Sequence, residues 1–218
     1  MTFIVECIRI RIEMRENTMK NMKEKVILTD CDGVLLDWLY AFEVWMAHQG
    51  FEIQDDQTYS VDKRYGIPVK QKELMIRFFN ESASMGFLPP LRDAIYYVKQ
   101  LHEKHGYVFH CITSLSKDEH AQELRKMNIE KLFGKGIFEK FIFLDTGADK
   151  DEVLEKYRDT GCYWIEDKFE NALVGKQMGL NSILVAHDHN AVAESVTGKN
   201  IPRCWKWKEI YNLITEND

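Results

Sequence analysis

Two aspartates separated by one residue follow an apolar run early in the chain. The run Val26–Thr29 is rich in β-branched residues, and Asp30, Cys31, Asp32 and Gly33 come directly after it. Side chains of an extended segment alternate between two faces, so we expect Asp30 and Asp32 to point one way and Cys31 the other. Two carboxylates this close repel each other unless a cation or a proton lies between them. The alternative is an acidic turn, because Asp and Gly are ordinary turn residues.

Hydroxyl, ammonium and carboxylate groups also follow the later apolar runs of the chain. They are Thr113 and Ser114 after the run 107–112, Lys150 after the run 141–144, and Glu166 and Asp167 after the run 162–165. The carboxyl ends of parallel strands lie along one edge of a sheet, where open α/β sheets bind their ligands. We therefore expect these groups to converge with the two aspartates. Each of them alone is more typical of a strand-end hydroxyl, a solvated lysine or a helix cap.

The spacing of apolar residues predicts the elements that must position these groups. Strands are expected at 24–30, 107–112, 141–144, 162–165 and 182–186, and helices at 35–48, 69–80, 91–105, 116–127, 149–158, 169–178 and 207–214. Strands that alternate with helices at this spacing indicate βαβ units, and short apolar strands indicate burial on both faces. The prediction is an α/β protein with a Rossmann-like three-layer α/β/α fold and a parallel central sheet.

One segment interrupts the alternation of strands and helices. Residues 38–89 contain two helical patterns and a polar stretch but no apolar strand, and a pair of prolines ends the segment. We predict a core domain of residues 23–37 and 90–218, with a small helical cap of residues 38–89 inserted after the first strand. Residues 1–22 are expected to form a partly disordered N-terminal extension, with an added edge strand as the alternative.

The composition excludes several classes of function. The chain has 218 residues, of which 45% are hydrophobic and 29% charged, as expected for one good core with a small accessory domain. A net charge of −6 argues against a nucleic-acid polymer as partner. Five cysteines without CxxC spacing favour neither zinc nor a disulfide framework. Apolar runs are too short for a membrane span or a signal peptide, so we expect no membrane contact and a cytoplasmic protein.

The segments that carry the polar groups resemble, in order, the four motifs of the haloacid dehalogenase superfamily of phosphatases. The first motif, DxDGV/T, is similar to Asp30–Val34, and the second, an apolar strand ending in Thr or Ser, is similar to Val108–Thr113. Lys150 resembles the lone lysine of the third motif, and Trp164–Asp167 resembles the acidic pair of the fourth. The resemblance covers residues 24–216, and the predicted insert is similar to the family's type 1 cap.

Two segments also resemble the 5′(3′)-deoxyribonucleotidase group within this superfamily. They are Asp32–Trp38, and Phe87–Ala94 leading to Ile112–Ser114. The chain departs from that group at Asp93, where glycine is usual, and at Leu115, where proline is usual. The context of the lysine differs as well. The resemblance to the superfamily is therefore stronger than the resemblance to the nucleotidases.

The resemblance implies a phosphatase that works through an aspartyl-phosphate. Asp30 would be the nucleophile, and Asp32 would protonate the leaving oxygen and then deprotonate water, which requires a proton on Asp32 near neutral pH. Thr113 would hydrogen-bond the transferring phosphoryl group, and Lys150 would neutralise its charge. The substrate would be a small phosphorylated metabolite, with a 5′-(deoxy)nucleotide as the candidate, and the enzyme a monomer or homodimer.

The cofactor that the resemblance implies is Mg²⁺, which prefers oxygen ligands. Its ligands would be the carboxylates of Asp30 and Asp167 and the backbone carbonyl of Asp32, with Glu166 in support. Three alternatives remain open. A dehalogenase-type hydrolase would not need the second aspartate, a phosphomutase would differ in its cap, and a non-catalytic protein could keep the fold as a binding module.

The residues that select the substrate are expected in the insert. Trp38, Phe42 and Trp45 recur at helical spacing, so they would either stack on a base or form the packing face of their helix. Ser114, next to the second motif, is a further substrate-binding candidate. His187 follows the run 182–186, where we expect a solvent-exposed loop rather than a metal ligand.

Overall fold

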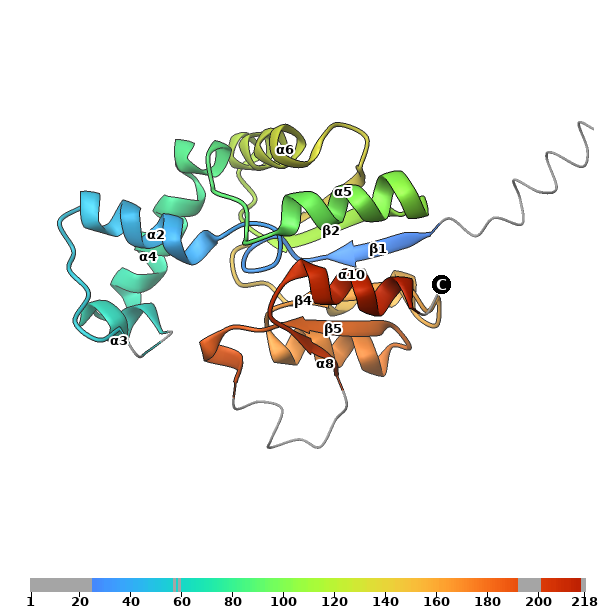
Figure 1. The fold of residues 1–218 in the computed structure, drawn as a ribbon. Helices are drawn as coiled ribbons and strands as arrows, with labels where there is room; N and C mark the ends of the chain where they lie inside the picture. The colour runs from blue at the N-terminus through green and yellow to red at the C-terminus, as the bar shows by residue number, and fades with distance from the viewer. Residues whose placement is uncertain (1–24, 57, 59, 192–200, 217–218) are drawn as a thin grey trace, which may run out of the picture.

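The computed structural model describes residues 25–56, 58, 60–191 and 201–216. The predicted N-terminal extension, residues 1–22, lies outside the described residues. Figure 1 shows a sheet covered by helices, with a separate group of helices (α2, α3 and α4) beyond the carboxyl ends of the strands.

Six parallel strands form the sheet in the order β3-β2-β1-β4-β5-β6. The strands are β1 Val26–Thr29, β2 Val108–Ser114, β3 Phe138–Leu144, β4 Tyr163–Glu166, β5 Asn181–Val185 and β6 Arg203–Cys204. β1 lies in the centre, with Thr29 level with Cys111 of β2 and with Ile165 of β4. The strand order reverses at β1, and ligands of such sheets bind at that point. The sheet confirms the predicted α/β fold with a parallel centre.

Alternating side chains of the strands divide the core into two layers. Ile27 and Ile165 face α5 Ala94–His105, α6 Glu119–Phe133 and α10 Trp207–Thr215. Leu28 and Trp164 face the opposite layer, which contains α7 Asp151–Leu154, η2 Glu155–Tyr157 and α8 Phe169–Gln177. Burial on both faces explains why the strands are almost wholly apolar. Each helix of the described residues is too short or too polar to cross a membrane.

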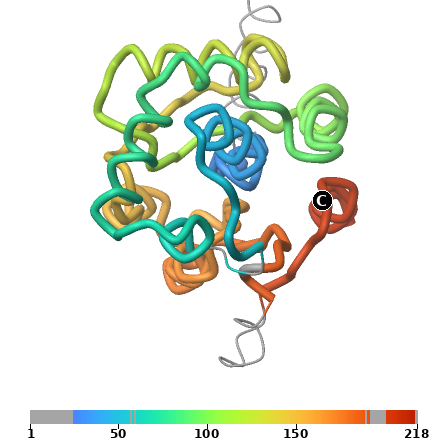
Figure 2. Tube along the Cα trace, turned by 90° about the vertical axis from the view of Figure 1, so that its left-hand side faces the viewer, coloured from blue at the N-terminus to red at the C-terminus, as the bar shows by residue number. Residues whose placement is uncertain are grey.

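The segment between β1 and α5 leaves the core and returns beside its starting point. It contains α2 Trp38–His48, α3 Val61–Tyr65, α4 Val69–Asn80 and η1 Ala83–Gly86. Leu36 pairs antiparallel with Pro90, and the amide of Asp37 donates to the carbonyl of Pro89 at 2.9 Å. Figure 2 shows this segment in front of the carboxyl ends of the strands. We call residues 38–89 the insert, and we propose that it acts as a cap.

Several elements begin elsewhere than the sequence predicts, and two short ones were missed. α2 begins at Trp38 because the carboxylate of Asp37 accepts the amide of Tyr40 at 3.2 Å. α6 begins after Asp118, whose carboxylate accepts the amide of Ala121 at 2.7 Å. The predicted cap, Ser116, instead donates to Glu81 of the insert. α3 and β6 were not predicted.

Candidate active site

The loop after β1 turns sharply within a few residues. The amide of Asp30 still pairs with Ile165 of β4 at 2.9 Å, and the carboxylate of Asp30 accepts the amide of Cys31 at 2.6 Å. Gly33 has φ of +70°, and a Cβ placed there would lie 2.3 Å from Oδ2 of Asp167. The loop therefore needs glycine for both its conformation and its close approach to β4. Cys31 is fully buried in the core.

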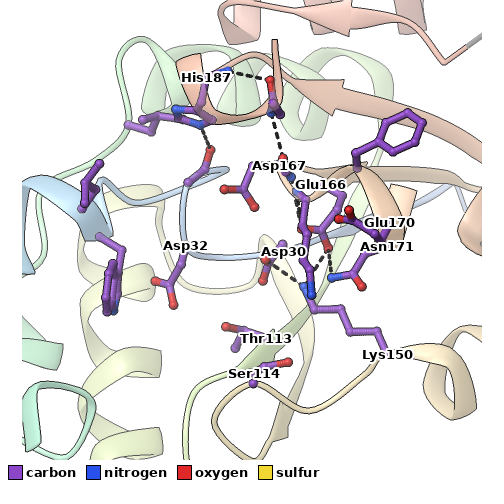
Figure 3. A pocket seen from close by; sticks show the side chains of 18 of the residues that line it. Asp30, Asp32, Thr113, Ser114, Lys150, Glu166, Asp167, Glu170, Asn171 and His187 are labelled. Atoms are coloured by element: carbon purple, nitrogen blue, oxygen red, sulfur yellow. Dashed lines mark hydrogen bonds and ion pairs between the residues drawn. The ribbon is translucent and has the colours of Figure 1, made fainter. Parts of the chain in front are cut away.

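A cavity of about 630 Å³ opens at the carboxyl ends of β1, β2 and β4. Its wall includes Asp30, Asp32, Trp38, Thr113, Ser114, Lys150, Glu166 and Asp167. Figure 3 shows the labelled members of this group pointing toward one another from the ends of separate strands and from the loops that follow strands. The structure thus brings together most of the site residues that the sequence singled out. Phe42 and Trp45 are absent from the wall.

Lys150 joins two of the acidic residues. Its Nζ lies 2.8 Å from Oδ2 of Asp30 and 2.8 Å from Oε2 of Glu166. The ammonium also lies 5.2 Å from the ring centroid of Trp164. Lys150 is 2% exposed. Burial alone would lower the pKa of Lys150, but the charges of Asp30 and Glu166 outweigh burial and raise it. The lysine is therefore a fixed cation.

Glu166 accepts more hydrogen bonds than the other carboxylates of the site. Its Oε1 accepts the amides of Asp167 and Lys168 at 3.1 and 3.0 Å, and Asn171 donates to Oε2 at 3.3 Å. Burial alone would raise the pKa of Glu166, but Lys150 and these donors hold it below its ordinary value. Glu166 is therefore held as a carboxylate at neutral pH.

The pKa values of the other two carboxylates, Asp30 and Asp167, are raised. Burial raises the pKa of Asp30 to about 8, against the pull of Lys150 and with further repulsion from Glu166. Burial and the same repulsion raise the pKa of Asp167 well above its ordinary value. Oxygens of Asp30, Glu166 and Asp167 lie within 4.8 Å of one another. Three clustered oxygen donors, of which one ammonium contacts two, fit a hard divalent cation such as Mg²⁺.

Asp32 has a partner that the sequence did not predict. Its Oδ1 accepts Nη1 of Arg125 at 2.5 Å, and Arg125 is fully buried in α6. From the sequence we expected Asp32 to hold a proton beside other carboxylates. A guanidinium in contact with Asp32 was not predicted. To protonate a leaving oxygen, Asp32 must present its second oxygen to the cavity or exchange this contact. The apolar spacing of α6 gave no signal for Arg125.

Thr113 and Ser114 end β2 at the cavity but differ in their hydroxyl contacts. Thr113 is 1% exposed, and its Oγ1 has no hydrogen-bond partner among the residues that the structure describes. Ser114 donates to the carbonyl of Ala148 at 2.7 Å. The Thr113 hydroxyl can serve a ligand. Ser114 lines the cavity and its hydroxyl ties the loop before Lys150 to β2, so its predicted role in substrate binding stays a prediction.

The aromatic residues of α2 divide between the cavity and the packing face. Trp38 lines the cavity, and its indole Nε1 donates to Oδ1 of Asn80 at 2.9 Å. Phe42 is fully buried and stacks on Trp38 with ring centroids 4.7 Å apart. Trp45 packs on Phe42 and Phe79. Phe42 and Trp45 do not line this cavity, and Trp45 is partly exposed. Their contacts fit the alternative of a packing face, and substrate contact at these two residues stays an untested prediction.

The loop after β5 supplies contacts that sequence reasoning missed. His187 lines the cavity, and its Nε2 lies 2.7 Å from the carbonyl of Gly33. Burial lowers the pKa of His187. Asn190, which ends η3 Asp188–Asn190, donates to the carbonyls of Asp167 and Val185 at 2.8 and 2.7 Å. The expected solvent-exposed loop instead holds both acidic loops in place.

Comparison by sequence finds one distant relative with no established activity. No protein-family model matches the chain. An uncharacterized 32.4 kDa protein of Enterobacteria phage T4 is 26% identical over 140 residues, which cover 61% of this chain and 49% of the phage protein. The chain therefore spans about half the length of the curated relative that it matches.

Comparison by structure identifies the fold. A haloacid dehalogenase-like family hydrolase from Streptococcus pneumoniae has a TM-score of 0.60 and 15% identity, over 88% of this chain and 98% of that one. A predicted phosphatase from Clostridium acetobutylicum has the same TM-score and identity, over 88% and 99%. The D,D-heptose 1,7-bisphosphate phosphatase from B. bronchiseptica, complexed with magnesium and phosphate, has 0.58 and 11%, over 89% and 99%. The fold is thus that of the haloacid dehalogenase-like hydrolases and phosphatases.

Proposed function

We propose that the protein is a Mg²⁺-dependent phosphatase that hydrolyses a small phosphomonoester through an aspartyl-phosphate. The observation that carries this proposal is the charge balance at the cavity. Three carboxylates lie within 4.8 Å of one another, and one ammonium contacts two of them. The same cavity is lined by Thr113, whose hydroxyl has no partner among the described residues. A phosphatase needs this combination, namely a nucleophile, a cation site and a hydrogen-bond donor for the phosphoryl oxygens.

Asp30 is the proposed nucleophile. Its carboxylate oxygen attacks phosphorus as the bond to the leaving oxygen breaks, and Asp32 gives that oxygen a proton. Water then attacks the aspartyl-phosphate, Asp32 takes the proton, and phosphate leaves. Lys150 holds Asp30 in place through its 2.8 Å contact and neutralises charge on the phosphoryl group. Thr113 donates to a phosphoryl oxygen.

The residues that would hold Mg²⁺ are Asp30 and Asp167, through their carboxylates, and Asp32, through its backbone carbonyl. Glu166 supports them, because both of its oxygens already accept hydrogen bonds. When bound, the ion stabilises the ionised nucleophile and the charge on the phosphoryl group. The raised pKa of Asp30 gives this requirement a physical cause, since the ionised carboxylate is disfavoured without a nearby cation.

The remainder of the cavity selects the substrate. Trp38 presents its indole to the cavity, with its position fixed by Asn80 on one side and Phe42 on the other. A rigid ring at this place favours a planar leaving group, and a nucleoside 5′-monophosphate fits that description. The volume of about 630 Å³ suits a ligand of this size.

A phosphate-release assay tests the proposal. We expect wild type to release phosphate from an aryl phosphate with Mg²⁺ and not with chelator, and Asp30→Asn to lose roughly a thousandfold or more of kcat. Asp37→Asn is the matched control, because Asp37 lines the same cavity and asparagine caps α2 as well as aspartate does. Equal rates for wild type and Asp30→Asn would refute the proposal. A panel of nucleotides and sugar phosphates, with Trp38→Leu, then tests the substrate class.

A further inference from the structure

We infer that Arg125 is a positioning residue that fixes the carboxylate of Asp32 at the cavity and ties it to the insert. Nη1 of Arg125 donates to Oδ1 of Asp32 at 2.5 Å and to Sγ of Cys31 at 3.1 Å. Nη2 lies 2.9 Å from Sδ of Met85, in η1. One side chain of α6 thus contacts the loop after β1 and the insert. This inference rests on the proposed function of Asp32.

The two members of the ion pair depend on each other unequally. The side chain of Arg125 is fully buried, whereas that of Asp32 is 24% exposed. A guanidinium stays protonated, and a buried one is costly without an anion. Among the described residues, the ion pair of Arg125 is formed with Asp32. Asp32 could be solvated alone, but Arg125 needs Asp32, so the buried cation holds the carboxylate in one orientation.

The third contact makes the position of Asp32 depend on how the insert is seated. Gly86 follows Met85 in η1, and a Cβ placed there would lie 3.1 Å from Cε of Met127 and 3.3 Å from Cδ2 of Leu124. η1 therefore packs closely on α6, with the sulfur of Met85 against the guanidinium. A shift of η1 would remove the contact between Met85 and Arg125, and the guanidinium would then fix the carboxylate of Asp32 less firmly.

A residue that acts through Asp32 should matter most when the leaving oxygen needs a proton. An alkoxide leaves poorly without protonation, whereas a dinitrophenolate leaves readily as the anion. Loss of Arg125 should therefore slow phosphoryl transfer to Asp30 far more from an alkyl phosphate than from a dinitrophenyl phosphate. A merely structural role would slow both reactions equally, because it would disturb Asp30 and Lys150 as well.

The experiment measures kcat and KM of wild type, Arg125→Met and Arg125→Lys with glycerol 2-phosphate and with 2,4-dinitrophenyl phosphate. For Arg125→Met we expect a loss of about 10- to 100-fold in kcat/KM on glycerol 2-phosphate and a small loss in kcat/KM on the aryl ester. The ratio kcat/KM is the quantity compared because it reports phosphoryl transfer to Asp30 and not the later hydrolysis of the aspartyl-phosphate, in which Asp32 acts as base with either ester. Arg125→Lys should recover part of the loss, because an ammonium keeps the charge but not the forked geometry.

Asn128→Leu is the matched control. Asn128 is also a buried residue of α6 that reaches the insert, since it donates to the carbonyl of Leu88 at 3.0 Å, but it does not touch Asp32. Its loss should lower stability and leave the ratio of the two rates unchanged. Equal losses of kcat/KM on both esters with Arg125→Met would overturn the inference.

A thermal-unfolding cycle keeps the inference testable if wild type proves inactive. Asp32→Asn leaves Arg125 buried without an anion, so it should lower the unfolding temperature, and adding Arg125→Met should restore much of it. Additive effects would overturn the inference. Absence of phosphate release by wild type would refute the proposed function instead, and the cycle would still decide whether Arg125 holds Asp32.

Discussion

Thr113 combines burial with an unused hydrogen-bonding group. Buried hydroxyls in folded proteins are nearly always hydrogen-bonded, and the exceptions have a reason. The hydroxyl of Thr113 faces the cavity at the end of β2, and its partner is not found among the described residues. Because this hydroxyl lies at the cavity wall without a partner among the described residues, we propose that it serves a ligand.

Loss of the hydroxyl at position 113 should affect stability and activity differently. Thr113→Val replaces the hydroxyl with a methyl group of similar size, so we expect the free energy of unfolding in urea to stay level or rise by about 1 kcal/mol. Phosphate release should fall by roughly 10²- to 10³-fold, as for other lost donors to a transition state. Thr113→Ser, which keeps the hydroxyl, should retain most activity. A valine variant as active as wild type would refute this role.

The sequence revealed the site residues that follow strands but not the residues that hold them. Asp30, Thr113 and Asp167 end apolar runs, so their position in a parallel sheet follows from strand geometry alone. Arg125 and Asn190 act through contacts with residues far away in the chain. No local pattern marks such partners, because an arginine in a helix is ordinarily exposed.

At the scale of elements, the loop after β1 must pass very close to the end of β4. Gly33 allows this approach, and a side chain there would collide with Asp167, a proposed metal ligand. Gly50 has a similar backbone conformation, with φ of +83°, but a Cβ added there would meet no atom within 4 Å among the described residues. The two glycines therefore share a conformational requirement and differ in their surroundings.

We use this difference to predict the effect of alanine at both positions. Gly50→Ala should cost roughly 1–2 kcal/mol of stability from its backbone conformation alone. Gly33→Ala should carry the same cost and also displace Asp167. Thermal unfolding with and without Mg²⁺ should therefore show a metal-dependent rise for wild type and Gly50→Ala but little rise for Gly33→Ala. Equal rises for both variants would contradict the close approach.

The elements themselves were predictable where they were long or strongly apolar. All the strands beside the site appear as apolar runs, and helices such as α4 match their predicted bounds, Val69–Asn80. α3 and β6 were not predicted because α3 has five residues and β6 has two, which are too few to show a periodic pattern of apolar residues. The start of α6 was predicted at the wrong residue because both Ser116 and Asp118 are good N-cap residues. The sequence does not show which of the two caps the helix.

At the scale of the whole molecule, the charge cluster links the proposed metal to stability. Asp30 has its pKa raised from 3.8 to about 8, chiefly by burial. The protonated form is thus favoured in the folded state, so this contribution to stability is present below about pH 4 and is lost as pH rises to about 8. Asp167 is shifted in the same direction. Glu166, with its lowered pKa, acts in the opposite sense at acid pH.

Unfolding temperatures should reveal this linkage. In chelator, we expect the unfolding temperature of wild type to fall more steeply between about pH 5 and about pH 8 than that of Asp30→Asn, because the variant lacks the titrating group. Mg²⁺ should flatten the wild-type curve, since a bound cation compensates the ionised carboxylate. The comparison with Asp30→Asn isolates this residue from other titrating groups. Parallel curves for the two proteins in chelator would contradict the assignment.

The central place of β1 has a consequence for how the protein is made. β1 leaves the ribosome early, but its partner β4 begins only at Tyr163. At roughly 5–20 residues per second, translation of the intervening chain takes on the order of ten seconds. During that time the side of β1 that pairs with β4 stays open, and Asp30 lacks Glu166 and Asp167. The ion proposed for this site therefore cannot bind the nascent chain until most of the sheet has been translated, so it would stabilise the finished fold and would not guide its early assembly.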